Sequence, residues 1–148
     1  MAKIRKVMMA SDFSSASRAA FARAVELAKA NRATLLVMHA VTLPPPTLGG
    51  EYLPPQAWDR IEAASRTAAQ KQIAQLLARA RRAGVRATGV IGAGSPYELI
   101  ARVARSRRAD VLVLGTHGRT GLSRFFLGSV AARVLATAPC PVLTVRGR

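Results

Sequence analysis

The sequence has few of the features that mark secreted or membrane proteins. Its one cysteine, Cys140, cannot form an internal disulfide, which fits a reducing compartment. No apolar stretch approaches the roughly 20 residues that a membrane span needs. The basic start over residues 1–6 is not followed by the long apolar run of a secretory signal. We therefore expect a cytoplasmic protein that does not enter a membrane.

Aromatic and acidic residues are also scarce. Two Tyr, four Phe and one Trp offer few platforms for stacking bases, so nucleic acid is not expected as a partner. Seven acidic residues stand against 23 basic ones, which gives a net charge of +16. No acid lies between Glu62 and Glu98 or after Asp110. This charge either attracts polyanions or reflects a general use of arginine at solvated positions.

Apolar residues, in contrast, are plentiful. Half of the 148 residues are hydrophobic, which is enough for one core, and the length suits a single domain over residues 1–148. Cys140 stands between Pro139 and Pro141. It could be a reactive thiol, but we favour a small apolar residue that packs where a strand begins.

Strand-like and helix-like segments alternate along the chain. Continuous apolar runs predict buried strands over residues 7–10, 34–41, 85–91, 111–114 and 141–145. Apolar residues at helical spacing predict helices between them, one of them over residues 58–82. The proline-rich stretch 42–57 is predicted to be a loop. The order predicts an α/β fold: an open parallel five-stranded sheet with helices on both faces.

Two local patterns refine the helices. The tetrad Ser95-Pro96-Tyr97-Glu98 has the form of a capping box, in which Ser95 and Glu98 would each bond the other's backbone amide. In the last helix, one side is predicted to carry the apolar residues Leu127, Val130, Val134, Leu135 and Ala138.

In open parallel sheets, ligands bind beyond the carboxyl ends of the strands, where the strand order reverses. This rule points to four segments: residues 10–14, 39–42, 92–95 and the stretch from Gly115 onward. The first begins with Ala10, Ser11 and Asp12. The Asp12 carboxylate either contacts a ligand or caps the first helix, as Asp and Ser commonly do.

The most informative stretch runs from Gly115 to Ser129 and leads into the last helix. Glycines let the backbone approach a ligand closely, and successive amides in such a loop can surround an anion. The amides of Gly128, Ser129 and Val130 would be donors in the first turn of that helix, where its dipole favours a phosphate. Neither a Walker A loop nor a dinucleotide fingerprint is present, because the Lys and the glycine spacing are missing.

Two other side chains in this stretch are candidates. His117 could bind phosphate or act as an acid, but without a paired carboxylate we favour a role in shaping the loop. Arg119, like Arg124, could hold phosphate with its guanidinium fork, or could simply be solvated.

The spacing of Gly115, Gly118 and Gly128-Ser129 resembles the ATP-binding signature of the universal stress protein family. The resemblance covers essentially the whole chain, including residues 10–14, 38–41, 92–96 and 140–145. It implies a sheet of order 3-2-1-4-5 with the ligand between the first and fourth strands. It also implies a homodimer formed through the last strand, Val142 to Val145, which is otherwise an open edge.

The resemblance also assigns roles to residues. Asp12 would contact the ribose or the base edge, and Ala40 and Val41 would hold adenine through backbone groups and an apolar wall. Leu114 and Gly115 would lie under the ribose. Gly118, Gly128, Ser129 and Val130 would surround the phosphates.

The expected function is therefore ATP binding by a regulatory protein of the stress response, with Mg²⁺ or Mn²⁺ as a possible companion of the phosphates. No catalytic residue is assigned, because the sequence shows no nucleophile paired with His and no cluster with metal-ligand spacing. The alternatives are a slow ATPase or a nucleotidyl-transfer enzyme on the same fold and, third, a nucleic-acid binder held by charge.

Overall fold

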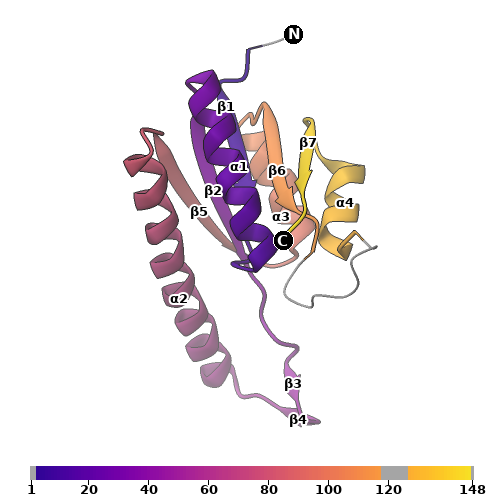
Figure 1. Ribbon diagram of the computed structural model, residues 1–148. Helices are drawn as coiled ribbons and strands as arrows, with labels where there is room; N and C mark the ends of the chain where they lie inside the picture. The colour runs from indigo at the N-terminus through magenta and orange to yellow at the C-terminus, as the bar shows by residue number, and fades with distance from the viewer. Residues whose placement is uncertain (1–2, 118–126, 148) are drawn as a thin grey trace.

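The computed structural model describes residues 3–117 and 127–147. Within these ranges the elements are β1 (Lys6–Ala10), α1 (Ser15–Asn31), β2 (Thr34–Val41), β3 (Thr47–Leu48), β4 (Glu51–Tyr52), α2 (Pro55–Arg82), β5 (Ala87–Ala93), α3 (Pro96–Ser106), β6 (Val111–Gly115), α4 (Ser129–Thr137) and β7 (Val142–Val145). A parallel sheet has the order β5-β2-β1-β6-β7 (Figure 1). Counted along the chain, its five strands have the order 3-2-1-4-5, as predicted.

The central strands are buried on both faces because helices cover both sides of the sheet. Val7 and Met9 of β1 pack in one core cluster with the apolar side chains of α1 and α2. Met8, between them, points the other way into a second cluster with side chains of α3 and α4. Successive side chains of a strand point to opposite faces of the sheet, and here helices cover both faces. Most residues of the central strands are therefore apolar, which explains the continuous apolar runs in the sequence.

Local structure bounds helix α1 at both ends. The Ser14 hydroxyl oxygen accepts a hydrogen bond from the Ser17 amide at 3.2 Å, which caps the first turn. Its buried face is narrow, formed by Ala20, Ala24 and Ala28 around Phe21, so the helix lies close to the sheet. It ends at Arg32, which adopts a left-handed conformation with φ 55°.

The proline-rich stretch departs from the prediction of a plain loop. Strands β3 and β4 form a small antiparallel hairpin there, with Gly49 and Gly50 in the turn. Both glycines have positive φ, 63° and 86°, as tight hairpin turns require. Helix α2 begins at Pro55, three residues before the predicted start. Its first turns and the hairpin extend beyond the sheet (Figure 1).

Strand β5 also differs from its predicted range, since it covers Ala87–Ala93 rather than 85–91. Val85 is buried, but its amide donates to the Ala80 carbonyl at 3.0 Å and so belongs to the turn after α2. An apolar residue that packs into the core from a turn looks, in the sequence, like the first residue of a strand.

Two helix predictions need correction. Ser95 is the N-cap of α3, but its side chain makes no capping bond, and the Glu98 carboxylate accepts from the Tyr97 hydroxyl at 3.2 Å. The capping box is therefore not formed. In α4 the buried residues are Ala131 and Val134, whereas Leu127, Val130 and Leu135 are 39%, 36% and 45% exposed. Of the predicted side, Val134 is therefore confirmed as buried and Ala138 packs against the same core cluster, but the inward face also includes Ala131 in place of the three exposed residues.

None of the helices in the described ranges combines the length and the apolar character that crossing a membrane requires.

Truncating a buried side chain should lower the free energy of unfolding far more than truncating an exposed one. Leu112 in β6 is fully buried, so Leu112→Ala should lower the free energy of unfolding by about 2–5 kcal/mol. Tyr52→Ala, at a position that is 77% exposed, should change it by less than about 1 kcal/mol. Urea denaturation of both variants measures the difference. Equal losses would contradict the packing described for β6.

Candidate functional site

A cavity of about 620 Å³ opens at the carboxyl ends of β1, β2 and β6. Neighbouring strands β1 and β6 lead to helices on opposite faces of the sheet, so the cavity lies where the strand order reverses. Pockets that hold small molecules commonly have 300–1,000 Å³, and this one is within that range. Predicted residues from three strand ends and from the start of α4 line it together: Ala10, Ser11, Asp12, Ala40, Val41, Leu114, Gly115, His117, Gly128, Ser129 and Val130. Gly118 and Arg119 lie outside the described residues.

The turn after β1 holds Asp12 at the rim of this cavity. The Asp12 carboxylate accepts from the Ser14 amide at 3.0 Å, and the Asp12 amide donates to the Ser17 hydroxyl at 3.0 Å. Phe13, between them, has a positive φ of 63°, and its amide donates to the Ser11 hydroxyl at 3.1 Å. Ser14 caps α1, so Asp12 is not the cap. Its half-buried carboxylate is instead fixed beside the cavity.

His39 is part of the same wall. It is 8% exposed, and its Nδ1 lies 2.7 Å from the Ser11 carbonyl oxygen. A carbonyl can only accept, so Nδ1 carries the proton in this contact. The ring also stacks on Phe13 with centroids 4.3 Å apart. His39 therefore ties the end of β2 to the turn after β1, a role that its place in the sequence did not reveal.

The end of β2 forms an apolar slot with an open backbone edge. The ladder between β1 and β2 ends at the pair Ala10 and Met38, followed by one bond from the Ser11 amide to the Met38 carbonyl. Alternation along β2 turns the backbone groups of Ala40 to the same side, beyond that ladder. The Val41 carbonyl, in contrast, faces β5 and accepts from the Gly94 amide at 3.2 Å. Ala40 thus offers backbone donors and acceptors, while Val41 contributes apolar surface.

Helix α2 closes this slot, and the sequence did not predict its contribution. Ser65, Ala68, Ala69 and Gln72 line the cavity from the middle of the helix. Only Ala69 of these is buried, so the polar Ser65 and Gln72 remain accessible from the cavity. Helical periodicity marks Ala69 as a core position but carries no sign that its neighbours face a ligand.

The start of α4 provides donors on the other side of the cavity. Gly128 is its N-cap, and no side chain caps the first turn. The Gly128 amide donates to the Thr116 carbonyl at 2.7 Å. It was predicted to donate to a ligand, but this bond inside the protein occupies it. The first-turn amides of Ser129, Val130 and Ala131 come next, and a helix leaves such groups without partners inside the helix. The positive end of the α4 helix dipole therefore lies next to the cavity.

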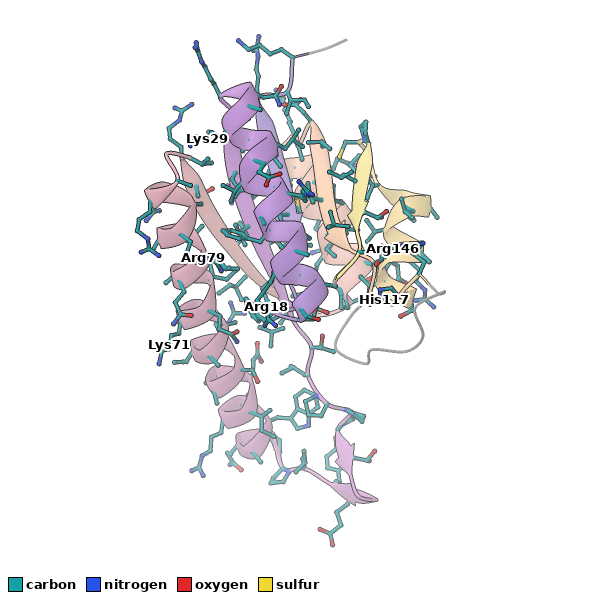
Figure 2. The ribbon with its side chains drawn as sticks, in the orientation of Figure 1. Arg18, Lys29, Lys71, Arg79, His117 and Arg146 are labelled. Atoms are coloured by element: carbon teal, nitrogen blue, oxygen red, sulfur yellow. The ribbon has the colours of Figure 1, made fainter. Side chains whose placement is uncertain are left out.

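His117 lies at the end of β6 that leads to the cavity (Figure 2). Its Nδ1 is 2.9 Å from the Thr116 hydroxyl. Thr116 in turn holds Gly128 through its carbonyl, so this pair connects β6 to the start of α4.

The described residues contain no group of three or more His, Cys, Asp or Glu side chains that could hold a metal ion.

The sequence profile of the universal stress protein family matches residues 3–146. The chain belongs to the universal stress protein family. A universal stress protein from Thermus aquaticus is 34% identical over 142 residues, which cover 96% of this chain and 98% of that protein.

Solved structures of universal stress proteins have a fold similar to that of this chain. The universal stress protein UspA from Lactobacillus plantarum has a TM-score of 0.85 at 24% identity and covers 99% of this chain and 100% of its own. A universal stress protein in complex with cAMP has a TM-score of 0.66 at 27% identity, with coverage of 99% and 100%.

In this universal stress protein, Gly115 is needed for packing as well as for the cavity wall. A Cβ at Gly115 would lie 2.9 Å from the backbone carbonyl carbon of Ala16, and one at Gly147 would lie 3.0 Å from the Ala16 Cα. Both contacts are with backbone atoms, which cannot turn away. The two glycines therefore allow the start of α1 to lie directly against the ends of β6 and β7.

Replacing Gly115 should strain this contact. Gly115→Ala should lower the free energy of unfolding by about 1–3 kcal/mol, because the first turn of α1 must shift. Gly92→Ala is the matched control, since its Cβ would meet only the flexible end of Leu99 at 3.3 Å. Urea denaturation compares the two variants. A control as damaged as Gly115→Ala would count against backbone crowding as the cause.

Cys140 should behave as a packing residue. Burial, and to a smaller extent the charge of Asp110, raises the pKa of its thiol, and the side chain packs against the cluster beneath α3 and α4. The rate of alkylation should therefore keep rising with pH beyond about 8.5, where an ordinary thiol levels off. The unfolded chain is the control. A plateau below that pH in the folded protein would indicate a reactive thiol instead.

Proposed function

We propose that this universal stress protein is a regulatory protein that binds an adenine nucleotide, with ATP as its ligand, in the cavity at the ends of β1, β2 and β6. The observation that carries the proposal is the pairing of two surfaces across one cavity. One is an apolar slot with the open backbone of Ala40, and the other is the amide-lined start of α4. A flat apolar base and a chain of phosphates need these two surfaces.

The placement of the nucleotide follows from these surfaces. Adenine lies between β2 and α2, where the Ala40 backbone can bond its edge and Val41 supplies apolar contact. The ribose lies near Asp12, whose carboxylate can accept from a hydroxyl. The phosphates lie at the amides of Ser129 and Val130. The cAMP bound to a family member that is 27% identical supports an adenine ligand for this fold.

The predicted residues Gly118 and Arg119 belong to the phosphate side of this proposal, together with the first turn of α4. The described residues provide no metal cluster, so Mg²⁺ or Mn²⁺ would be held mainly by the phosphates themselves. No step of catalysis is required. Occupancy would change the conformation or the partners of the protein in the cytoplasm during stress.

A homodimer through β7 is part of the same proposal. Strand β7 is an edge of the sheet, so its outer backbone groups can pair with another strand. Four of the large apolar side chains exposed in the described ranges lie on or next to α4 and β7: Leu127, Val130, Leu135 and Leu143. A second copy that pairs with β7 could cover them.

One substitution can remove a single proposed phosphate donor without removing the helix. Ser129 is the first residue of α4, where proline is favoured, and Gly128 before it has φ −58° and ψ 152°, which proline tolerates. Ser129→Pro should weaken ATP binding by about 10-fold or more, because a hydrogen bond to a charged group contributes about 1.5–3 kcal/mol. Titration with a fluorescent ATP analogue measures the dissociation constant.

Ser129→Ala is the matched control, because it removes the hydroxyl and keeps the amide. Its effect should be smaller than that of Ser129→Pro. Equal affinity of the wild type and Ser129→Pro would show that the phosphates lie elsewhere. Absence of binding by ATP, AMP and cAMP at millimolar concentration would overturn the proposed function itself.

A further inference from the structure

The fold gathers basic residues at the edge of the sheet opposite the cavity. The parallel strands begin at this edge, and α1, α2 and α3 end there. Eleven of the 23 basic residues lie in these turns, a set that we call the amino-edge cluster: Lys3, Arg5, Lys6, Lys29, Arg32, Arg81, Arg82, Arg86, Arg105, Arg107 and Arg108. Figure 2 shows Lys29 at this end of α1 and Arg18 at the other.

The cluster is hardly neutralised by acids. The only acid in these turns is Asp110, whose carboxylate accepts from the backbone amides of Arg5 and Lys6, both at 2.8 Å. The ion pairs among the described residues join Arg23 to Glu26, one turn before Lys29 in α1, and Arg66 to Glu62 in α2, so neither pair uses a basic residue of the cluster. The Lys6 ammonium donates to the carbonyl of the residue after α3 at 2.7 Å and so supports the end of that helix. The arginines of the cluster are exposed.

A general preference for arginine does not explain this distribution. Such a preference would leave the acids spread over the surface as well. Instead, five of the seven acids lie in the half of the molecule that holds the cavity: Asp12, Glu51, Asp59, Glu62 and Glu98. The molecule is therefore electrically polarised along its strands.

Backbone conformation gives a second reason. Three helix-to-strand turns at this edge contain a residue with positive φ. Gly84 fills this place after α2, with φ 85°, but Arg32 and Arg108 fill it after α1 and α3, with φ 55° and 53°. Glycine adopts this conformation without strain, and arginine does not. A cation can stabilise the end of a helix, but Lys29 and Arg105 already lie in the last turns of α1 and α3.

We propose that the amino-edge cluster binds the phosphate backbone of double-stranded nucleic acid without reading its sequence. Four neighbouring strands begin beside cluster residues, and strands about 4.8 Å apart place these turns along a row of about 14 Å. That length is close to the roughly 12 Å width of a major groove, so the turns can reach phosphates on both of its sides. Guanidinium groups suit phosphate because their donors form a fork.

The edge lacks what other polyanions would require. The described aromatic residues that are not buried all lie toward the cavity end: Phe13, Tyr52, Trp58 and Tyr97. No base-stacking platform is therefore present among the described residues of this edge. Of the exposed large apolar side chains, Tyr52, Leu127 and Val130 lie toward the cavity end, and Leu135 and Leu143 lie on α4 and β7, outside the turns that carry the cluster. The cluster itself therefore has no apolar side chain of this kind to insert into an anionic bilayer. The proposal departs from the sequence-based expectation that nucleic acid is not a partner, since contacts with a duplex backbone need no aromatic residues.

The test uses the full chain and a random 25-base-pair DNA duplex. The double variant Arg32→Gly and Arg108→Gly relieves two strained positions, so its melting temperature should stay the same or rise. Its affinity for the duplex in 50 mM salt, measured by fluorescence anisotropy, should fall at least 10-fold. The slope of log affinity against log salt should become shallower by about two, because each arginine removed leaves about one phosphate without its cation.

The control double variant, Arg18→Gln and Arg60→Gln, removes the same charge at the cavity half and should bind the duplex within about 2-fold of wild type. ATP affinity should be unchanged in Arg32→Gly with Arg108→Gly, which separates this proposal from the proposed function. Equally weakened binding in the two double variants would overturn a localised surface. Tighter binding of single-stranded DNA, or binding of phosphatidylserine vesicles but not of the duplex, would also overturn it.

Discussion

The close approach of α1 to the ends of β6 and β7 is the contact on which the site depends. Ala16 lies between Gly115 and Gly147, and both would crowd its backbone if they carried a Cβ. This contact fixes the start of α1 at the carboxyl edge of the sheet. The preceding turn, with Asp12 and the strained Phe13, is consequently held at the cavity rim, where its hydrogen bonds to Ser14 and Ser11 stabilise it.

Reversal of the strand order then creates the cavity itself. Because β1 leads to a helix on one face and β6 leads to the other face, no helix of residues 3–117 and 127–147 covers the sheet edge between them. The hydrogen bond from Gly128 to Thr116 brings α4 to this opening, with its first-turn amides toward the cavity. Helix α2 reaches over from the other side with Ser65 and Gln72. A polar and an apolar wall thus face the same space.

The two ends of the sheet have different electrostatic character. Most acids lie with the cavity, whereas the opposite edge carries basic residues at the ends of three helices. Arg32 and Arg108 occupy positions that glycine would fill without strain, as Gly84 does in the equivalent turn. One domain therefore has main-chain amides at the cavity and basic side chains at the opposite edge, and the two proposals of anion binding concern surfaces that do not overlap.

The sequence by itself determined the order of the elements and most of the strand ends in the site. The apolar run 111–114 is typical of a strand buried on both faces, and β6 lies there. The sequence also predicted that the glycine-rich stretch after it leads into the last helix, which is α4. Only the tertiary structure decided that Gly128 bonds Thr116, that Gly115 makes room for Ala16, that α2 lines the cavity, and that arginines from four separate turns meet at one edge. Periodicity indicates that one side of an element is buried, although in α4 it did not identify that side correctly. It carries no information on which distant segment lies against it, because crossover connections and sheet order set those contacts.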